Sequence, residues 1–232
     1  MASFIAEAHA APDELSTIAN VMTAPPLPFL PPEAHGQLIV MALLAYAGPL
    51  EEGERVLAPF RELATPIADM VRPIPYPEIY PPDDEEYRPI PAVKNMFLEG
   101  VDLGAAEAII ERIRSSDAPM AVTQLRVLGG AMARVPADAT AFALRSSKIM
   151  VNVAALYEAP EERSTHEAWC DAFAAAIRQD DDGVYVNFLV DEGEARVRAA
   201  YPGPTWDRLA EIKARYDPTN LFRRNQNIPP AE

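Results

Sequence analysis

The chain has 232 residues, of which 49% are hydrophobic and 24% charged. This composition is typical of a globular protein with enough residues for one large domain or two small ones. Its 35 acidic and 20 basic residues give a net charge of −15. That charge argues against nucleic acid and membrane partners, because both attract clustered cations.

Hydrophobic periodicity predicts most of the secondary structure. In chain order it predicts a buried strand at 37–46, a helix over 52–64, a helix over 103–116, strands at 120–128 and 131–135, a central strand at 147–157, a helix over 165–178, a strand at 183–190 and a helix over 206–216. The pair Gly129–Gly130 suits a hairpin turn or a bulge. A hairpin makes two consecutive strands antiparallel. We therefore expect an α+β fold, an antiparallel or mixed β-sheet covered by helices on one face.

The helix over 206–216 has recognisable end signals. Thr205 is the expected N-cap, because a threonine hydroxyl can accept a hydrogen bond from a free N–H of the first turn. Asp217 precedes Pro218, and a residue before proline is disfavoured in the helical conformation. The helix is therefore expected to stop there.

Proline is unusually frequent, with 24 residues against about 12 at the average frequency of ~5%. The prolines concentrate at 25–32 and 73–91, where they favour rigid, extended connections. Because aromatic residues such as Phe29, Tyr76 and Tyr80 are interspersed, we expect ordered loops that lie over a domain. A flexible spacer between two domains is the alternative.

Cysteine and histidine usage limits the chemistry. Cys170 is the one cysteine, which excludes an intramolecular disulfide and a cysteine-based metal site and suits a reducing compartment. The three histidines lie far apart, so we expect no metal. The longest apolar run, 38–47, is about half a membrane span, and the first eleven residues lack the basic start of a secretion signal. We therefore expect a cytoplasmic protein in which Cys170 is a small packing residue.

Polar residues concentrate in the last quarter of the chain. In a strand over 183–190, Tyr185 and Asn187 would share one face. A buried asparagine is costly unless its amide is paired, so Asn187 is expected to have a specific partner or to face a cavity. The tail at 216–228 holds three asparagines and a glutamine among apolar residues. Such side chains are expected to bind backbone groups or a ligand.

The run YVNFLVDEGEARVRAAYPGPTWDRLAEIKARYDPTNLFRRNQNIPP, residues 185–230, resembles the C-terminal signature of the berberine bridge enzyme-like FAD-linked oxidases. These belong to the vanillyl-alcohol-oxidase type of flavoprotein. Segments 11–32, 45–63 and 127–145 also resemble the substrate domain of that family, in the same order. The resemblance therefore extends over nearly the whole chain.

The resemblance implies a substrate (cap) domain, whose antiparallel sheet is backed by helices and places its other face over the flavin. It predicts a cap domain at 1–182 and a berberine-like segment at 183–232 that packs on the same domain. In the family an FAD-binding domain of comparable size precedes this part. The resemblance thus implies a truncated chain, which would bind FAD only with a complementary FAD-binding domain.

The family's functional positions transfer to two stretches. Gln124 matches a position that orients or deprotonates substrate, and a glutamine can orient but cannot act as a general base. Val122 and Arg126 alternate with it along the strand and are expected to line the substrate pocket. In the second stretch, the resemblance places Tyr185 and Asn187 close to the cofactor.

Two aromatic positions complete the predicted pocket. Relatives that use a tyrosine base often carry it directly after the Asn187 position, where this chain has Phe188, which cannot take a proton. Phe188 is therefore expected to line the pocket. Tyr76 is expected to contribute from the second proline cluster, together with Tyr80, Tyr87 and Phe97.

These expectations favour an FAD-dependent oxidoreductase substrate domain, in which hydride passes from a small organic substrate to flavin, inactive without its FAD-binding domain. The alternative is a non-enzymatic small-molecule binding or interaction module that kept the cap fold. The sheet face turned toward the flavin would be uncovered in this chain. It is expected to bind an FAD-domain polypeptide or to self-associate.

Overall fold

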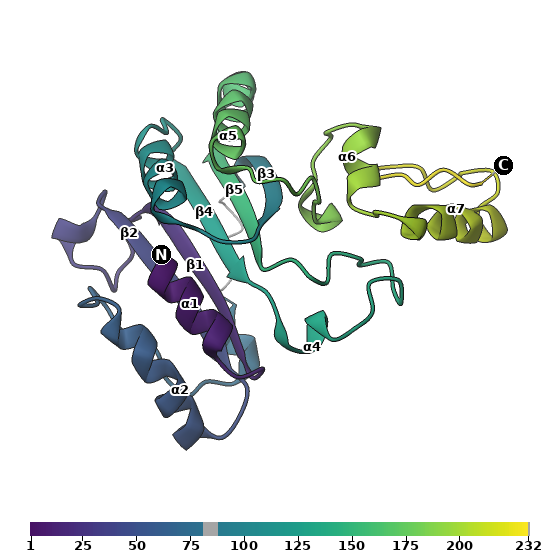
Figure 1. The fold of residues 1–232 in the computed structure, drawn as a ribbon. Helices are drawn as coiled ribbons and strands as arrows, with labels where there is room; N and C mark the ends of the chain where they lie inside the picture. Colours follow the sequence, from purple (N-terminus) through teal and green to yellow (C-terminus); the bar gives the residue numbers. More distant parts are fainter. Residues whose placement is uncertain (81–87, 232) are drawn as a thin grey trace.

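The computed structural model describes residues 1–80 and 88–231. Its centre is a five-stranded antiparallel sheet with the strand order β2-β1-β4-β5-β3 (Figure 1). The strands are β1 (Leu15–Thr23), β2 (Leu38–Tyr46), β3 (Ile90–Leu98), β4 (Met120–Val127) and β5 (Ile149–Tyr157). β2 and β3 therefore form the two edges of this sheet.

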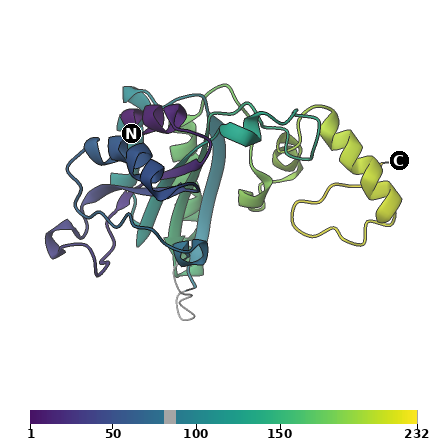
Figure 2. The same cartoon turned by 90° about the horizontal axis from the view of Figure 1, so that it is seen from below.

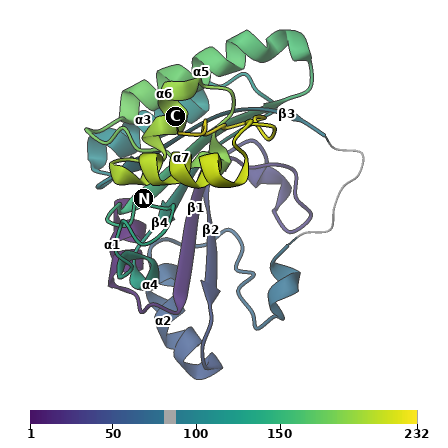
Figure 3. The same ribbon diagram turned by 90° about the vertical axis from the view of Figure 1, so that its right-hand side faces the viewer.

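Helices cover one face of the sheet, which confirms the predicted α+β fold. The helices are α1 (Ala2–Ala10), α2 (Leu50–Glu62), α3 (Leu103–Arg114), α4 (Gly130–Ala133), α5 (Arg163–Ile177), α6 (Glu194–Ala199) and α7 (Pro204–Tyr216). α3 and α5 lie next to each other along the strands (Figure 3), and α7 is set apart from them (Figure 2).

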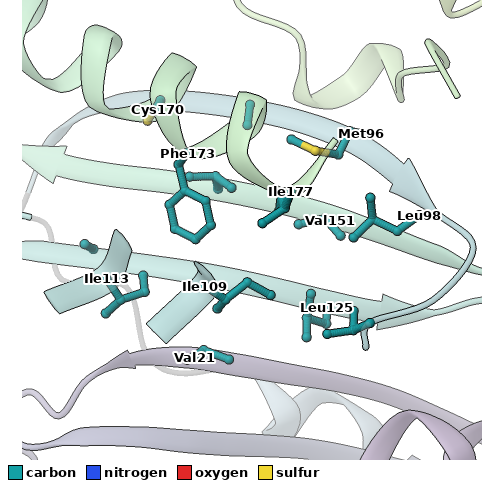
Figure 4. Close-up of a cluster of buried hydrophobic side chains, with 14 of the residues drawn as sticks. Val21, Met96, Leu98, Ile109, Ile113, Leu125, Val151, Cys170, Phe173 and Ile177 are labelled. Carbon is teal, nitrogen blue, oxygen red and sulfur yellow. The ribbon is translucent and has the colours of Figure 1, made fainter. Parts of the chain in front are cut away.

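The hydrophobic core lies between the sheet and helices α1, α3 and α5. On β4 the side chains of Ala121, Thr123 and Leu125 alternate inward, as expected for a strand with one buried face. Phe173 of α5 points from its helix toward the strands (Figure 4). Every strand residue of this core cluster lies on the same side of the sheet, so the side chains of the opposite face are not part of the cluster.

Cys170 is a packing residue of α5. Its thiol is buried and donates a hydrogen bond to the Ala92 carbonyl, with sulfur and oxygen 3.4 Å apart. Burial raises the pKa of the thiol to about 12, and the thiolate is the reactive form. We expect no reaction with a thiol reagent at pH 8 in the folded protein and full reaction after unfolding in guanidinium. Rapid labelling of the native state would contradict this placement.

The strand predicted at 37–46 is confirmed as β2, but it is not a buried strand. β2 lies at the sheet edge, and Val40 and Leu43 are exposed. A continuous apolar run cannot distinguish an edge strand from a central one, because strand order depends on pairing between distant segments.

The sequence pattern does not predict β3, because its second residue is Pro91 and the proline cluster at 73–91 favours a loop. A proline is tolerated in an edge strand, since its missing N–H need not pair. The first proline cluster connects β1 to β2, and the Ala24 and Gln37 backbones hydrogen-bond across it. Part of the second cluster, including Tyr87, lies outside the described residues.

The predicted hairpin at Gly129–Gly130 is wrong. β4 continues to pair with β5, because the Leu128 amide donates to the Lys148 carbonyl. The chain then turns at Gly130, whose φ of +56° is accessible to glycine, and begins the single helical turn α4. The double glycine ends a strand rather than joining two strands.

The predicted strand at 183–190 is also wrong. Its centre is a single 3₁₀ turn, Val186–Phe188, closed by a hydrogen bond from the Phe188 amide to the Tyr185 carbonyl. The Tyr185 amide donates to the side chain of Asn95 on β3, with nitrogen and oxygen 2.6 Å apart. The Asn95 side chain therefore takes the backbone hydrogen bond that the Tyr185 amide would donate to a neighbouring strand if 183–190 were a strand.

The last predicted helix is confirmed as α7, and it ends at Tyr216 before Asp217 and Pro218. Thr205 is not its N-cap. The helix begins two residues earlier than predicted, at Pro204, a residue suited to a first turn, and the capping position is Gly203. Within the described ranges, no helix combines the length and hydrophobicity needed to cross a membrane.

Candidate functional site

The sheet face opposite the core carries three predicted site residues of β4. Val122, Gln124 and Arg126 alternate with the buried side chains of that strand and are partly exposed. This alternation places all three on one surface, as expected from the strand periodicity of two. The first stretch of the predicted site therefore forms a single surface.

A row of amide side chains crosses this face from strand to strand. Gln124 is paired with Asn20 of β1 on one side and with Asn152 of β5 on the other, and Asn152 is paired with Asn95 of β3. Directly opposed residues in antiparallel strands share a face. Four amides thus lie side by side, with Gln124 in an inner position.

The hydrogen bonds of the amide row hold Gln124 in place. The Gln124 Nε2 donates to Asn20 Oδ1 at 2.9 Å, and Asn20 Nδ2 donates to the Met41 carbonyl of β2 at 3.1 Å. The Oδ1 of Asn152 is buried and has no hydrogen-bond partner among the described residues. The Nδ2 of Asn95, which lies opposite Asn152, also has no partner among these residues, so the Asn152–Asn95 end of the row is its unsatisfied part.

Residues Tyr185–Phe188 reach the same face. The Tyr185 amide is bound by Asn95 of the amide row, and the Tyr185 Oη accepts a hydrogen bond from Asn187 Nδ2 at 2.7 Å. Since Asn187 supplies the donor, the hydroxyl hydrogen of Tyr185 can be donated to a ligand. Asn187 itself is exposed, so the expected burial is wrong, whereas the expected specific partner is present.

Aromatic rings surround Tyr185. Its ring lies 6.0 Å from that of Phe142 and 5.6 Å from that of Phe188. The Arg126 guanidinium lies over the Phe188 ring, 4.9 Å from its centre. This contact joins the β4 residues to the 185–188 segment, so the two predicted stretches form one site.

Tyr76 is not brought to this site. It is 70% exposed, and its hydroxyl hydrogen-bonds to that of Tyr80 at 3.0 Å. The rings of Tyr76 and Tyr80 contact each other edge to face, and in the described part of the chain no hydrogen bond or ring contact joins Tyr76 to β4 or to the 185–188 segment. Phe97, the other described member of that predicted aromatic lining, is buried in β3, and its pairing with Met150, which in turn pairs with Arg126, places it on the same sheet face as the β4 site residues.

Three amides of the row had not been predicted. Asn20 and Asn95 lie on β1 and β3, which the hydrophobic pattern did not predict. Asn152 lies on a correctly predicted strand, and a polar residue within the apolar run 149–157 was the signal that could have identified it. The row becomes visible only when the strand register is known.

The C-terminal segment is fixed to the edge strand β3. Lys94 Nζ pairs with Glu192 at 2.8 Å and with Asp171 of α5 at 3.1 Å, and Arg196 pairs with Glu192 at 3.4 Å. Gln226 in the tail donates to the Leu189 carbonyl at 2.7 Å, as expected for a backbone partner. These contacts position Tyr185 and Asn187.

Comparison with known proteins agrees with this arrangement. The family model "Berberine and berberine like" matches residues 184–229. Two FAD-linked oxidoreductases of Bacillus subtilis (strain 168), both described as uncharacterized, are similar over most of the chain: YgaK is 27% identical over 82% of it, and YvdP is 30% identical over 80%. Residues 184–229 thus match the berberine bridge enzyme-like family, and the chain is similar to FAD-linked oxidoreductases over about four fifths of its length. This confirms the resemblance recognised in the sequence.

The solved structures show the same fold. A glycopeptide hexose oxidase, DBV29, complexed with teicoplanin superimposes on 98% of this chain with a TM-score of 0.75 and 20% identity, and the match covers 50% of that protein. The chain covers 43% of YgaK and of YvdP. It therefore spans about half the length of the relatives that it matches, and it has the fold of their substrate domain.

Proposed function

We propose that this chain is the substrate-binding half of an FAD-dependent oxidoreductase, which transfers hydride from a carbon of a small organic substrate to flavin. The amide row on the helix-free sheet face, joined to Tyr185–Phe188, is the observation that carries the proposal. The relatives named as FAD-linked oxidoreductases and their greater length support it. An FAD-binding domain would have to cover this face.

The residues of the face suit a flavin. Its ring system is flat and carries carbonyl and N–H groups along one edge, and Tyr185 and Asn187 offer a hydroxyl and an amide beside aromatic rings. These two residues would hold the ring. When bound, the flavin supplies the hydride acceptor.

The chain's own residues would position the substrate. Gln124 Nε2 donates a hydrogen bond to Asn20, which fixes the amide, and its Oε1 would accept a hydrogen bond from a substrate hydroxyl or amine. Asn152 Oδ1, which has no described partner, can accept a second. Val122 and Phe188 exclude water from the same surface. Such fixed contacts act by orientation.

A non-enzymatic small-molecule binding module is the second candidate, and one observation favours it. The side chains of the amide row and Phe188 cannot take up a proton, although oxidation of an alcohol or amine releases one. A module of this kind would bind a ligand on the same face without flavin.

Mixing this chain with FAD and a separate polypeptide, the part of YgaK that the chain does not cover, tests the first candidate. We expect an equimolar complex in which flavin absorbance elutes with both polypeptides. Without that partner the chain is expected to self-associate through the same face, as light scattering would show. Separate elution with colourless protein would favour the binding module.

Substitution of Gln124→Ala tests the positioning role in the same complex. We expect flavin to be retained while anaerobic flavin reduction by the best substrate of a panel of sugars and of aromatic alcohols with and without a carboxylate slows about 100-fold, the cost of a misplaced substrate. Gln37→Ala, an exposed glutamine in the loop before β2, is the matched control. Equal rates for the two variants would contradict the role of Gln124.

A further inference from the structure

Arg126 is a half-buried cation without a counter-ion. Its Nη1 is shielded from solvent and has no hydrogen-bond partner, and within the described ranges no carboxylate forms an ion pair with it. The chain nevertheless carries 35 acidic residues. Burial lowers the pKa of the guanidinium. An unpaired buried charge is among the most costly arrangements in a folded protein.

Arg145 is an arginine of the same fold whose guanidinium donors all have hydrogen-bond partners. Its guanidinium also lies over an aromatic ring, 5.2 Å from the centre of Phe142. All three of its nitrogens are used: Nε donates to the Phe142 carbonyl, Nη1 to the Met132 carbonyl and Nη2 to Thr140 Oγ1. Arg145 therefore has a structural role, whereas Arg126 keeps its donors available.

The groups around Arg126 indicate which kind of ligand would pair with its guanidinium. Its guanidinium presents donors in a planar fork that matches the two oxygens of a carboxylate. Beside it stand the rings of Phe188 and Tyr185. Gln124, two residues away on the same strand face, offers an uncharged amide. The position thus suits a flat anionic group attached to an apolar or aromatic body.

We propose that Arg126 binds an anionic, carboxylate-like group, so that the substrates of the site are small aromatic or otherwise apolar carboxylates. This inference rests on the proposed function, because it assigns a substrate class to the same face. Two ligands could present a planar anionic edge to Arg126: the carboxylate of a substrate and the reduced, anionic flavin. The experiment separates these two sources.

The test is direct binding to the full chain, with no flavin and no turnover. Sodium benzoate is titrated by calorimetry and by amide NMR shifts, with benzamide as the uncharged analogue of the same shape. We expect benzoate to bind with shifts on β4 and the 185–188 segment. Because a charged hydrogen bond contributes about 1.5–3 kcal/mol, benzamide should bind at least about tenfold more weakly.

Variants assign the binding to Arg126. Arg126→Gln should weaken benzoate binding at least about tenfold, and Arg126→Lys, which keeps the charge but not the fork, should restore part of it. The matched control is Arg198→Gln, since Arg198 stacks on Trp206 at a similar 5.0 Å but lies on α6. Circular dichroism verifies that each variant is folded.

The outcomes separate the two sources. Displacement of benzoate by dithionite-reduced riboflavin would assign the anionic edge to the flavin, and simultaneous binding would assign it to the substrate. Absence of benzoate binding, or equal binding by Arg126→Gln, overturns the proposal. Neither of those results affects flavin retention in the two-polypeptide complex, so this inference and the proposed function can fail separately.

Discussion

Replacing Phe173 with alanine is expected to lower the free energy of unfolding by about 3–5 kcal/mol. Phe173 is completely buried between α5 and the sheet, and its ring packs edge to face on Trp169 with 5.3 Å between the centres. The cost combines the lost burial of the ring with the cavity left among side chains that can only partly collapse. Equilibrium unfolding in urea, followed by circular dichroism, measures it.

Leu103→Ala provides the control for that measurement. Leu103 is a large apolar residue at the start of α3, but it is 74% exposed, so its truncation should change stability by no more than about 0.5 kcal/mol. Equal losses of stability in the two variants would mean that Phe173 is not packed between α5 and the sheet.

Replacing Lys94 with methionine is expected to cost about 3 kcal/mol, the lower end of the range for breaking a buried ion pair. The variant keeps the apolar stem but removes the ammonium group from Glu192, whose side chain is 6% exposed. Among the described residues, the ion pair left to Glu192 is then the longer contact to Arg196. Hydrogen exchange should accelerate most in residues 183–200, because this pair joins that segment to β3.

The pH dependence of Lys94 gives a second readout. Burial disfavours its charge, but hydrogen bonds to Glu192 and Asp171 outweigh that effect, so the pKa of Lys94 is raised. A raised lysine pKa stabilises the fold below the ordinary value of ~10.4, and this contribution is lost as pH rises through the folded-state value. The wild type should therefore lose more stability above pH ~10.4 than Lys94→Met.

Arg72→Met is the matched control for Lys94→Met. Arg72 pairs with Glu78 at 3.2 Å, but both side chains are largely exposed, and such pairs contribute about 0–1 kcal/mol. A similar loss in the two variants would mean that the Lys94–Glu192 pair behaves as a surface contact.

Much of the local structure could be predicted from the sequence. The helices now seen as α2, α3, α5 and α7 were predicted because their apolar residues repeat with helical spacing and because end signals such as Asp217–Pro218 are local. The alternation of Val122, Gln124 and Arg126 was predictable for the same reason. β3 was missed because Pro91 argues against a strand unless its position at a sheet edge is known.

The sequence by itself determined the α+β class, the family signature at 185–230 and the shared face of Gln124 and Arg126, since each depends on neighbours along the chain. Only the tertiary structure decided that Gln124 lies in a row with Asn20, Asn95 and Asn152. Those residues come from four strands, and their register results from the packing of one sheet face against α1, α3 and α5. A different long-range contact, from the Tyr185 amide to the Asn95 side chain on β3, holds the segment that brings Phe188 to Arg126.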